Sequence, residues 1–347
     1  MAAKSLKANL ASAKKNKNDE FYTQLSDIES EVYHYRPHFK GKSVLLNCDD
    51  PEHSNFFRFF AAQFNILGLS RLVSTYYSTE KQPYKLVIEK DVNGDGKVNF
   101  EDLEKIPLSS NGDFRSDESI ELLKEADIVV TNPPFSLFRE FIALLEKYDK
   151  KFLVIGNQNA ISYKEIFSLI KNNRIWMGVS PRSMNFTLPS GETKNVNACW
   201  FTNMTHKKRN EEMILFREYY GEDAMQYPKY DNYDAIEVSK TADIPKDYEG
   251  AMGVPITFLD KYNPEQFEII ALGIVGSIDF TKNRKMEILD QNGKGTGKYT
   301  MNAKGTLYRK YNPNTDKKPA FMDYETKELY SSIYARIIIK NKKPILK

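Results

Sequence analysis

The chain has 347 residues, of which 41% are hydrophobic, so a large apolar core is possible and global disorder is excluded. It contains no apolar run long enough to cross a bilayer, and we expect no secretory signal because no apolar segment follows the N-terminal lysines. The two cysteines, Cys48 and Cys199, match no metal-ligand spacing. We therefore expect reduced thiols in a cytoplasmic protein that does not bind membranes.

Charge is distributed unevenly along the chain, although the net charge is only +3. Residues 281–347 carry 16 Lys and Arg against 6 Asp and Glu, whereas the preceding residues carry 34 against 41. A basic end on an acidic body suggests that this end contacts a polyanion. A solvated basic surface would have the same composition, so charge by itself leaves both interpretations open.

Hydrophobic periodicity predicts alternating strands and helices over the first 200 residues, after a lysine-rich arm or short helix at residues 1–18. The predicted helices cover 27–32, 55–64, 116–125, 136–148 and 163–171, and the predicted strands cover 43–48, 71–77, 84–89, 127–131, 151–156 and 196–203. This alternation is typical of an α/β protein with a parallel, doubly wound sheet, in which ligands bind at the carboxyl ends of the strands. After about Gly221 the alternation fades, and we expect a second α+β region with long loops.

A proline-rich turn, Asn132-Pro133-Pro134-Phe135, follows the predicted strand 127–131. Proline biases the preceding residue to extended geometry, so this turn can present the Asn132 side-chain oxygen beside the Pro133 carbonyl. Two such acceptors suit adenine N6, which must pyramidalise toward a methyl group, and Phe135 can stack on a base that has left the duplex. The alternative is a strand-ending turn with a phenylalanine in the core.

The stretch Thr131–Phe138, reading TNPPFSLF, resembles motif IV of N6-adenine methyltransferases. Together with Lys17–Gln24, reading KNDEFYTQ, it resembles the EcoRI-like adenine-specific DNA methyltransferase family of type II restriction-modification systems. The resemblance implies a Rossmann-like S-adenosylmethionine-dependent catalytic domain at residues 1–220 and a target-recognition, DNA-binding region at 221–347. It also implies that the chain flips an adenine out of double-stranded DNA and methylates it, with Asn132, Pro133, Pro134 and Phe135 as the catalytic residues. A monomer is the default expectation, and a cognate endonuclease would act on the same site without being bound.

The same resemblance implies a cofactor site at three places. Phe21, Tyr22 and Thr23 would pack over the methionine part of the cofactor, unless they are only a hydrophobic staple ahead of a helix. Asp50 would bind the methionine ammonium, and Ser54 or Asn55 its carboxylate, although this turn lacks the family's glycines. Asp113 and Phe114 would hold the cofactor's adenine, unless they are only a turn before a helix, and Asn132 would border the site. No acidic partner for the ribose follows the second strand, at Ser74–Tyr76.

A different pattern occupies residues 91–102, where the spacing fits a 12-residue EF-hand calcium loop. The last acidic position is aspartate rather than glutamate, and a β-like run lies upstream, so a helix-loop-helix pair is not indicated. The spacing predicts a structural calcium site, with a polar turn between core strands as the alternative. The ligands would be Asp91, Asn93, Asp95, Lys97 (through its carbonyl) and Asp102.

Basic residues at both ends of the chain are candidates for contact with DNA phosphates. In the C-terminal region they are interspersed with tyrosines and flexible glycines. The candidates are Lys14, Lys15, Lys17, Lys282, Arg284, Lys285, Arg309 and Lys310. Base-reading residues depend on side-chain geometry and are not assigned.

Two other functions fit parts of the sequence. A similar asparagine-proline-proline-aromatic turn serves methylation of RNA adenine or of a protein glutamine amide, and the basic C-terminal third favours DNA over both. A calcium-binding or nucleic-acid-binding module without catalysis would explain the loop and the basic region, but not the tetrad beside a cofactor-like site.

Overall fold

The computed structural model describes residues 22–180, 182–188, 190–221 and 224–345. The N-terminal arm, with Lys14, Lys15, Lys17 and Phe21, lies outside these residues. The chain divides into two compact units. Unit 1 comprises the described residues up to Ile170 and Arg174–Lys207, and unit 2 comprises Lys171–Asn173 and the described residues from Lys208 onward. No helix in the described ranges is long and apolar enough to cross a membrane.

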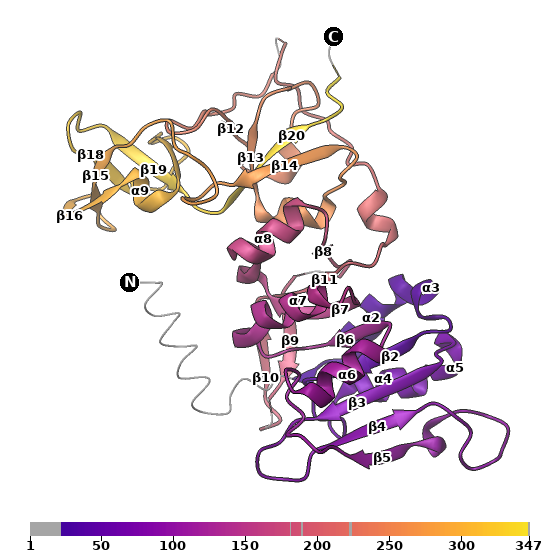
Figure 1. Cartoon of the computed structure of the whole chain (residues 1–347). Helices are drawn as coiled ribbons and strands as arrows, with labels where there is room; N and C mark the ends of the chain where they lie inside the picture. The colour runs from indigo at the N-terminus through magenta and orange to yellow at the C-terminus, as the bar shows by residue number, and fades with distance from the viewer. Residues whose placement is uncertain (1–21, 181, 189, 222–223, 346–347) are drawn as a thin grey trace. The chain divides into compact units, whose positions relative to one another are not determined.

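Unit 1 is built around an eight-stranded sheet with the order β5-β4-β3-β2-β6-β7-β11-β8 (Figure 1). The four central strands run parallel, whereas β4, β5, β11 and β8 are joined antiparallel to their neighbours. The sheet is therefore mixed: the predicted parallel arrangement is found in its four central strands and is wrong at both flanks. The tight connection between β3 and β4 explains one flank, because parallel neighbours need a long crossover. The strands are β2 (Ser43–Leu46), β3 (Arg71–Tyr76), β4 (Tyr84–Ile88), β5 (Glu104–Pro107), β6 (Ile128–Thr131), β7 (Lys151–Asn157), β8 (Trp176–Met177) and β11 (Ala198–Thr202).

Helices cover both faces of this sheet, as the near-continuous apolar strands require. On one face, α2, α4 and α5 share a core with alternate residues of the parallel strands, such as Val44, Leu46 and Val130. On the other face, α6 contacts β2 and α7 contacts β7, where the ring of Phe138 packs against Phe201 at 4.9 Å. The helices are α2 (Leu25–Val32), α3 (Arg36–Phe39), α4 (Asn55–Ala62), α5 (Phe64–Leu67), α6 (Asp117–Glu125), α7 (Phe138–Lys147) and α8 (Lys164–Lys171).

A small antiparallel sheet in unit 1 ties the start of the described chain to a later hairpin. Its strands are β1 (Tyr22–Thr23), β9 (Met184–Thr187) and β10 (Thr193–Val196), with Thr23 opposite Phe186. Glu31 in α2 helps to place this hairpin, because its buried carboxylate accepts hydrogen bonds from the backbone amides of Val179 and Ser180 at 2.8 and 2.7 Å.

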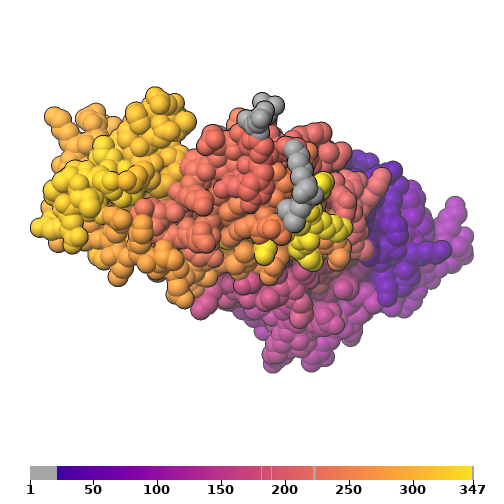
Figure 2. Space-filling model, turned by 90° about the horizontal axis from the view of Figure 1, so that it is seen from above, coloured from indigo at the N-terminus to yellow at the C-terminus, as the bar shows by residue number. Residues whose placement is uncertain are grey.

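Unit 2 contains two sheets that lie side by side in the ribbon view (Figure 1). In the space-filling view, yellow and light-orange residues of unit 2 gather in a lobe at the left (Figure 2). The four-stranded sheet has the order β12-β13-β20-β14, and the five-stranded sheet has the order β16-β15-β18-β19-β17. Their strands are β12 (Ile236–Glu237), β13 (Met252–Pro255), β14 (Phe267–Leu272), β15 (Lys285–Leu289), β16 (Gly295–Met301), β17 (Leu307–Lys310), β18 (Phe321–Asp323), β19 (Leu329–Ile333) and β20 (Arg336–Asn341).

The described part of unit 2 is mainly β structure with short 3₁₀ turns, rather than the α+β mixture expected from the sequence. The short segment α9 (Asn302–Gly305) is not an ordinary helix, because all four of its residues have positive φ, from 42° to 75°. The expected helices are replaced by hairpins, because the short apolar runs after residue 221 alternate with polar residues at the strand period.

Candidate active site

The predicted catalytic turn and the predicted cofactor turn meet at the carboxyl edge of the parallel strands. The register pairs Leu45 of β2 with Val129 of β6, so the two strands end together. The buried hydroxyl of Thr131 donates a hydrogen bond to the backbone carbonyl of Asn47. The hydrogen bond brings together two segments that are more than 80 residues apart in the sequence. They meet at the edge of the sheet where ligands of open α/β sheets bind.

The backbone of the tetrad is extended up to Pro134 and then turns, as expected for two consecutive prolines. Asn132 follows β6 directly and is only 7% exposed, and Pro133 is also buried. Pro134 is extended and leads into η3 (Phe135–Leu137), the 3₁₀ turn that precedes α7. The half-buried ring of Phe135 lies edge-to-face with Phe186 of β9, at 6.4 Å between centroids.

The turn after β2 is held by its own side chains rather than by glycines. Cys48 adopts a positive φ of 75°, the conformation that a glycine supplies more easily. The Ser54 hydroxyl donates to Asp49 at 2.7 Å and caps α4 by accepting from the Phe56 amide. Asp50 accepts from the Glu52 amide at 3.0 Å through one carboxylate oxygen. Since Ser54 serves as a helix cap, Asp50 is the better placed of the two to contact a ligand.

Asn55 connects this turn to the start of the described chain. Its side-chain amide donates to the backbone carbonyl of Thr23 at 2.7 Å, so both residues predicted to touch the cofactor lie at one place. The Tyr22 ring lies beside His53, with 6.2 Å between ring centroids.

The predicted adenine-binding pair lies in a loop that packs against the end of β3. Gly112 has a φ of +76°, and a Cβ there would lie 2.4 Å from the Tyr76 carbonyl oxygen, so no larger residue fits. The Asp113 carboxylate accepts two hydrogen bonds from the Arg115 guanidinium, at 2.9 and 2.7 Å. This contact lowers the pKa of Asp113. Phe114 is buried against Phe141 of α7 and anchors the loop.

The Cys48 thiol lies close to acidic residues of two of these segments. Burial raises the pKa of the Cys48 thiol well above its usual range, and the negative charges of Asp49 and Asp113 add to that rise. A hydrogen bond with Thr131 acts in the opposite direction. The Cys48 thiol therefore lies close to the turn after β2, to the Asp113 loop and to the end of β6.

A pocket of about 480 Å³ opens at the same edge of the sheet. Its lining comes from the turn after β2, the ends of β3 and β5 and the start of β4: Asp50, Glu52, Tyr76, Lys81, Gln82, Tyr84, Lys105 and Pro107. Lys105 bonds to Glu52 at 2.8 Å and lies over the Tyr84 ring at 3.8 Å. The hydrogen bond from Lys105 lowers the pKa of Glu52. Sequence reasoning named Asp50 but missed the lining residues of β4 and β5, because these strands reach this edge only through antiparallel pairing.

Several buried polar atoms at this edge have no hydrogen-bond partner among the described residues. They are the side-chain oxygens of Thr23, Asn47, Ser74 and Thr75. Buried polar atoms normally find partners, so such a group of unsatisfied oxygens marks a place where a polar ligand fits. Ser74 and Thr75 lie where the sequence offered no acidic partner for a ribose.

The structure does not support the calcium site predicted at residues 91–102. The Asp91 carboxylate accepts from the Gly94 and Gly96 amides, and the buried Asp102 carboxylate accepts from the Val92 and Asn99 amides. The oxygens of Asn93 and Asp95 accept from the amides of Asp95 and Lys97 in the same way. Within the described ranges, no group of three or more His, Cys, Asp or Glu residues is arranged to hold a metal ion. The loop is a polar turn between β4 and β5 that satisfies its own backbone.

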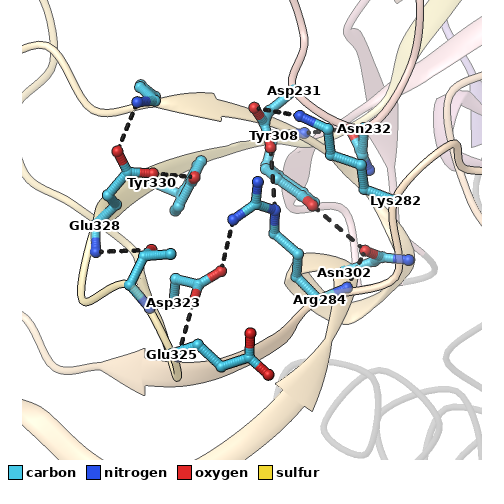
Figure 3. Close-up of polar contacts among 12 residues, drawn as sticks. Asp231, Asn232, Lys282, Arg284, Asn302, Tyr308, Asp323, Glu325, Glu328 and Tyr330 are labelled. Atoms are coloured by element: carbon cyan, nitrogen blue, oxygen red, sulfur yellow. Dashed lines mark hydrogen bonds and ion pairs between the residues drawn. The ribbon is translucent and has the colours of Figure 1, made fainter.

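The basic residues predicted to contact DNA fall into two classes in unit 2. The arginines are structural: Arg284 pairs with Asp231 and Asp323, and the buried Arg309 pairs with Glu237 and Asp316 (Figure 3 shows the Arg284 network). The lysines are at the surface. Lys282 pairs with Asp231 at 3.1 Å, Lys310 pairs with Glu328 at 2.6 Å, and Lys285 is exposed.

Comparison with known proteins gives the family of the chain. The family model described as "Adenine-specific methyltransferase EcoRI" matches residues 9–342. The chain is 48% identical over 296 residues to the type II methyltransferase M.EcoRI of Escherichia coli, covering 78% of this chain and 90% of that protein. It is 43% identical over 277 residues to the type II methyltransferase M.MpnI of Mycoplasma pneumoniae, covering 74% and 83% respectively. No solved structure matches the chain. The chain belongs to the EcoRI family of adenine-specific methyltransferases.

Proposed function

We propose that the chain methylates N6 of adenine within a specific sequence of double-stranded DNA, as the modification enzyme of a restriction-modification system. The observation that carries the proposal is the tetrad Asn132–Phe135 at the end of β6, hydrogen-bonded through Thr131 to the turn after β2. A cognate endonuclease would recognise the same DNA sequence without binding this chain.

In this proposal, Asn132 and Pro133 hold the amino group that is methylated. The Asn132 side-chain oxygen and the Pro133 carbonyl accept the two N6 hydrogens, which localises the nitrogen lone pair. Phe135 stacks on the adenine after it has left the duplex. S-adenosylmethionine supplies the methyl group as a sulfonium, which needs no covalent enzyme intermediate. The surplus N6 proton passes to water, because an amide oxygen is too weak a base to keep it.

The residues at the sheet edge fit the cofactor. Asp50 is placed to bind the methionine ammonium, and Asp113 to accept from the adenine amino group. The unsatisfied hydroxyl of Ser74, on the same side of β3 as the pocket-lining Tyr76, offers a polar contact for the ribose. Phe114 supports the adenine site from below rather than stacking freely, because it is buried against α7.

We assign the catalytic role to residues 1–220 and target recognition to residues 221–347. Four central parallel strands with a site at their carboxyl ends support a Rossmann-like methyltransferase sheet. The basic composition of the C-terminal residues supports contact with DNA.

The alternative substrates, RNA adenine and protein glutamine, are not supported. The family is adenine-specific, and the three matching relatives, including M.MgeORF184P of Mycoplasma genitalium at 39% identity over 309 residues, are type II methyltransferases. The same relatives argue against a binding module without catalysis.

The test is transfer of labelled methyl from S-adenosylmethionine to unmethylated genomic DNA, with digestion to nucleosides. We expect label in N6-methyladenosine, and we expect Asn132→Ala to reduce the rate by about 10²- to 10³-fold, as for loss of one transition-state hydrogen bond. Cofactor affinity should stay within about threefold of the wild type. Asn314→Ala, at an exposed asparagine of unit 2, is the control. Absence of transfer by a wild-type protein that binds the cofactor would refute the DNA substrate.

A further inference from the structure

One face of the five-stranded sheet is buried and the other is open at β15, β16 and β18. Met286 and Phe321 point into the core of the sheet with Tyr308 and Tyr330. Lys285 lies opposite Met301 on β16, and its carbonyl accepts the amide of Tyr324, which directly follows β18. Because side chains alternate along a strand, these three residues share the face opposite to Met286.

The open face carries large side chains that a soluble protein rarely exposes together. Tyr299, Met301 and Tyr324 are 47%, 47% and 45% exposed, and the rings of Tyr299 and Tyr324 lie 5.4 Å apart. The Lys285 ammonium lies over both rings, at 4.8 and 4.3 Å from their centroids. The two rings therefore hold this cation in one place, which removes much of the entropic cost that a free lysine would incur on binding.

Ion pairing separates this lysine from the other residues of unit 2 predicted to contact DNA, since Lys282, Arg284, Arg309 and Lys310 all pair with carboxylates. Among the described residues, Lys285 forms no ion pair, whereas Arg284 is neutralised by Asp231 and Asp323 (Figure 3). Lys327 adds a second positive charge over the other end of the patch, at 5.0 Å from the Tyr324 ring, and it too has no acidic partner within the described ranges. The acidic residue on this face, Glu287, accepts a hydrogen bond from the Gly297 amide at 2.9 Å.

We propose that this face, defined by Lys285, Tyr299, Met301, Tyr324 and Lys327, contacts the sugar-phosphate backbone of duplex DNA. The proposal rests on the proposed function and narrows it to one surface of unit 2. The lysines pair with phosphates, and the tyrosine hydroxyls and Met301 contact the sugar-phosphate edge. Arg284 and Arg309 are positioning residues that hold the strands and do not touch DNA.

The test measures how salt affects binding of random-sequence duplex DNA to the full chain. The slope of log affinity against log salt is negative, and each lost phosphate contact makes it shallower by about 0.9, which corresponds to about eightfold weaker binding near 0.1 M salt. We expect this change for Lys285→Met, which keeps the apolar stem between the rings. Replacing both tyrosines, Tyr299→Ala with Tyr324→Ala, should weaken binding. The slope should become shallower by no more than it does in Lys285→Met.

The matched control is Lys340→Met, an exposed lysine of β20 in the other sheet, which should leave affinity and slope unchanged. Thermal unfolding of each variant checks that it is folded. Wild-type affinity and slope in the Lys285→Met variant, with DNA methylation intact, would overturn this surface while leaving the proposed function standing. Failure of the wild-type chain to methylate DNA would instead refute the function itself.

Discussion

The Thr131 hydroxyl donates a hydrogen bond to the Asn47 carbonyl, which joins the strand before the catalytic turn to the strand before the cofactor turn. Both groups are buried, and the bond spans the boundary between β6 and β2 just beyond their last paired residues. This contact fixes the Asn132 turn relative to the turn after β2, and the proposed mechanism needs that relative position for methyl transfer.

Thr131→Val should therefore slow methyl transfer more than it weakens cofactor binding. Removing the hydroxyl leaves the Asn47 carbonyl unsatisfied, at a cost of about 1–3 kcal/mol in the free energy of unfolding. A shift of the turn by a fraction of an ångström should lower kcat by about 10- to 100-fold. Single-turnover kinetics with saturating cofactor measure this, and Thr131→Ser should restore most of the rate. Equal losses for valine and serine would contradict the role of the hydrogen bond.

Phe135→Ala should reduce methylation because the flipped adenine loses its stacking partner. Stacking on an aromatic residue contributes about 1–3 kcal/mol per base, which corresponds to roughly 5- to 150-fold in the rate at subsaturating DNA. Phe135→Tyr should retain activity, since the ring is kept. Cofactor affinity, measured by calorimetry, should not change in either variant. An alanine variant with wild-type kcat/KM for DNA would show that Phe135 is only a core residue packed on Phe186.

The ion pair of Asp113 and Arg115 predicts how cofactor affinity depends on pH. Arg115 holds the pKa of Asp113 below its usual value of 3.8, so the carboxylate is ionised throughout the range from pH 5 to 9. Titration of Asp113 should therefore cause no change in cofactor affinity over that range in the wild type. In Arg115→Met the pKa of Asp113 rises, and affinity should begin to fall as the pH is lowered toward 5. Asp113→Ala should weaken binding by about 10- to 100-fold at every pH.

The buried Arg309 should govern the stability of unit 2. Its guanidinium pairs with both Glu237 and Asp316. Arg309→Met leaves Asp316 without its cation and leaves Glu237 with Arg336 alone. Breaking a buried pair of this kind costs about 3–5 kcal/mol in the free energy of unfolding. Denaturant unfolding followed by tyrosine fluorescence measures this loss. Lys310→Met, at the neighbouring exposed lysine, should cost less than about 1 kcal/mol.

The same pair predicts a loss of stability in acid. Burial by itself would raise the pKa of Asp316, but hydrogen bonds from Arg309 and Ser331 outweigh it and lower the pKa to about 2. The folded-state pKa lies below the usual 3.8, so the stabilisation is complete above about pH 4 and is lost as the pH falls toward 2. Asp316→Asn should remove that pH dependence. An unchanged acid transition in this variant would assign it to other carboxylates.

The catalytic turn was predictable because its chemistry is local. An asparagine before two prolines fixes its own backbone, and the apolar strand before it places it at a sheet edge. The helix predicted at 116–125 and the strand predicted at 43–48 are confirmed as Asp117–Glu125 and Ser43–Leu46, since capping residues and apolar runs are recognisable within a few residues.

The calcium loop and the arginines show where local patterns mislead. The spacing of Asp91 to Asp102 suits an ion, yet the same carboxylates satisfy the amides of their own turn. Composition cannot distinguish the buried Arg309 from the exposed Lys285, because pairing depends on carboxylates that are distant in the chain, such as Glu237.

The sequence by itself determined the family, through its motifs, and the core elements of unit 1 and the turn at Asn132–Phe135, because periodicity and proline geometry act over short stretches of chain. Only the tertiary structure decided the antiparallel flanks of the main sheet, the pocket formed with β4 and β5, and the surface formed by Lys285 and its tyrosines. Those features depend on pairing between strands that are distant in the sequence. The free energy of this pairing comes from burial and hydrogen bonds between the strands, which no local pattern encodes.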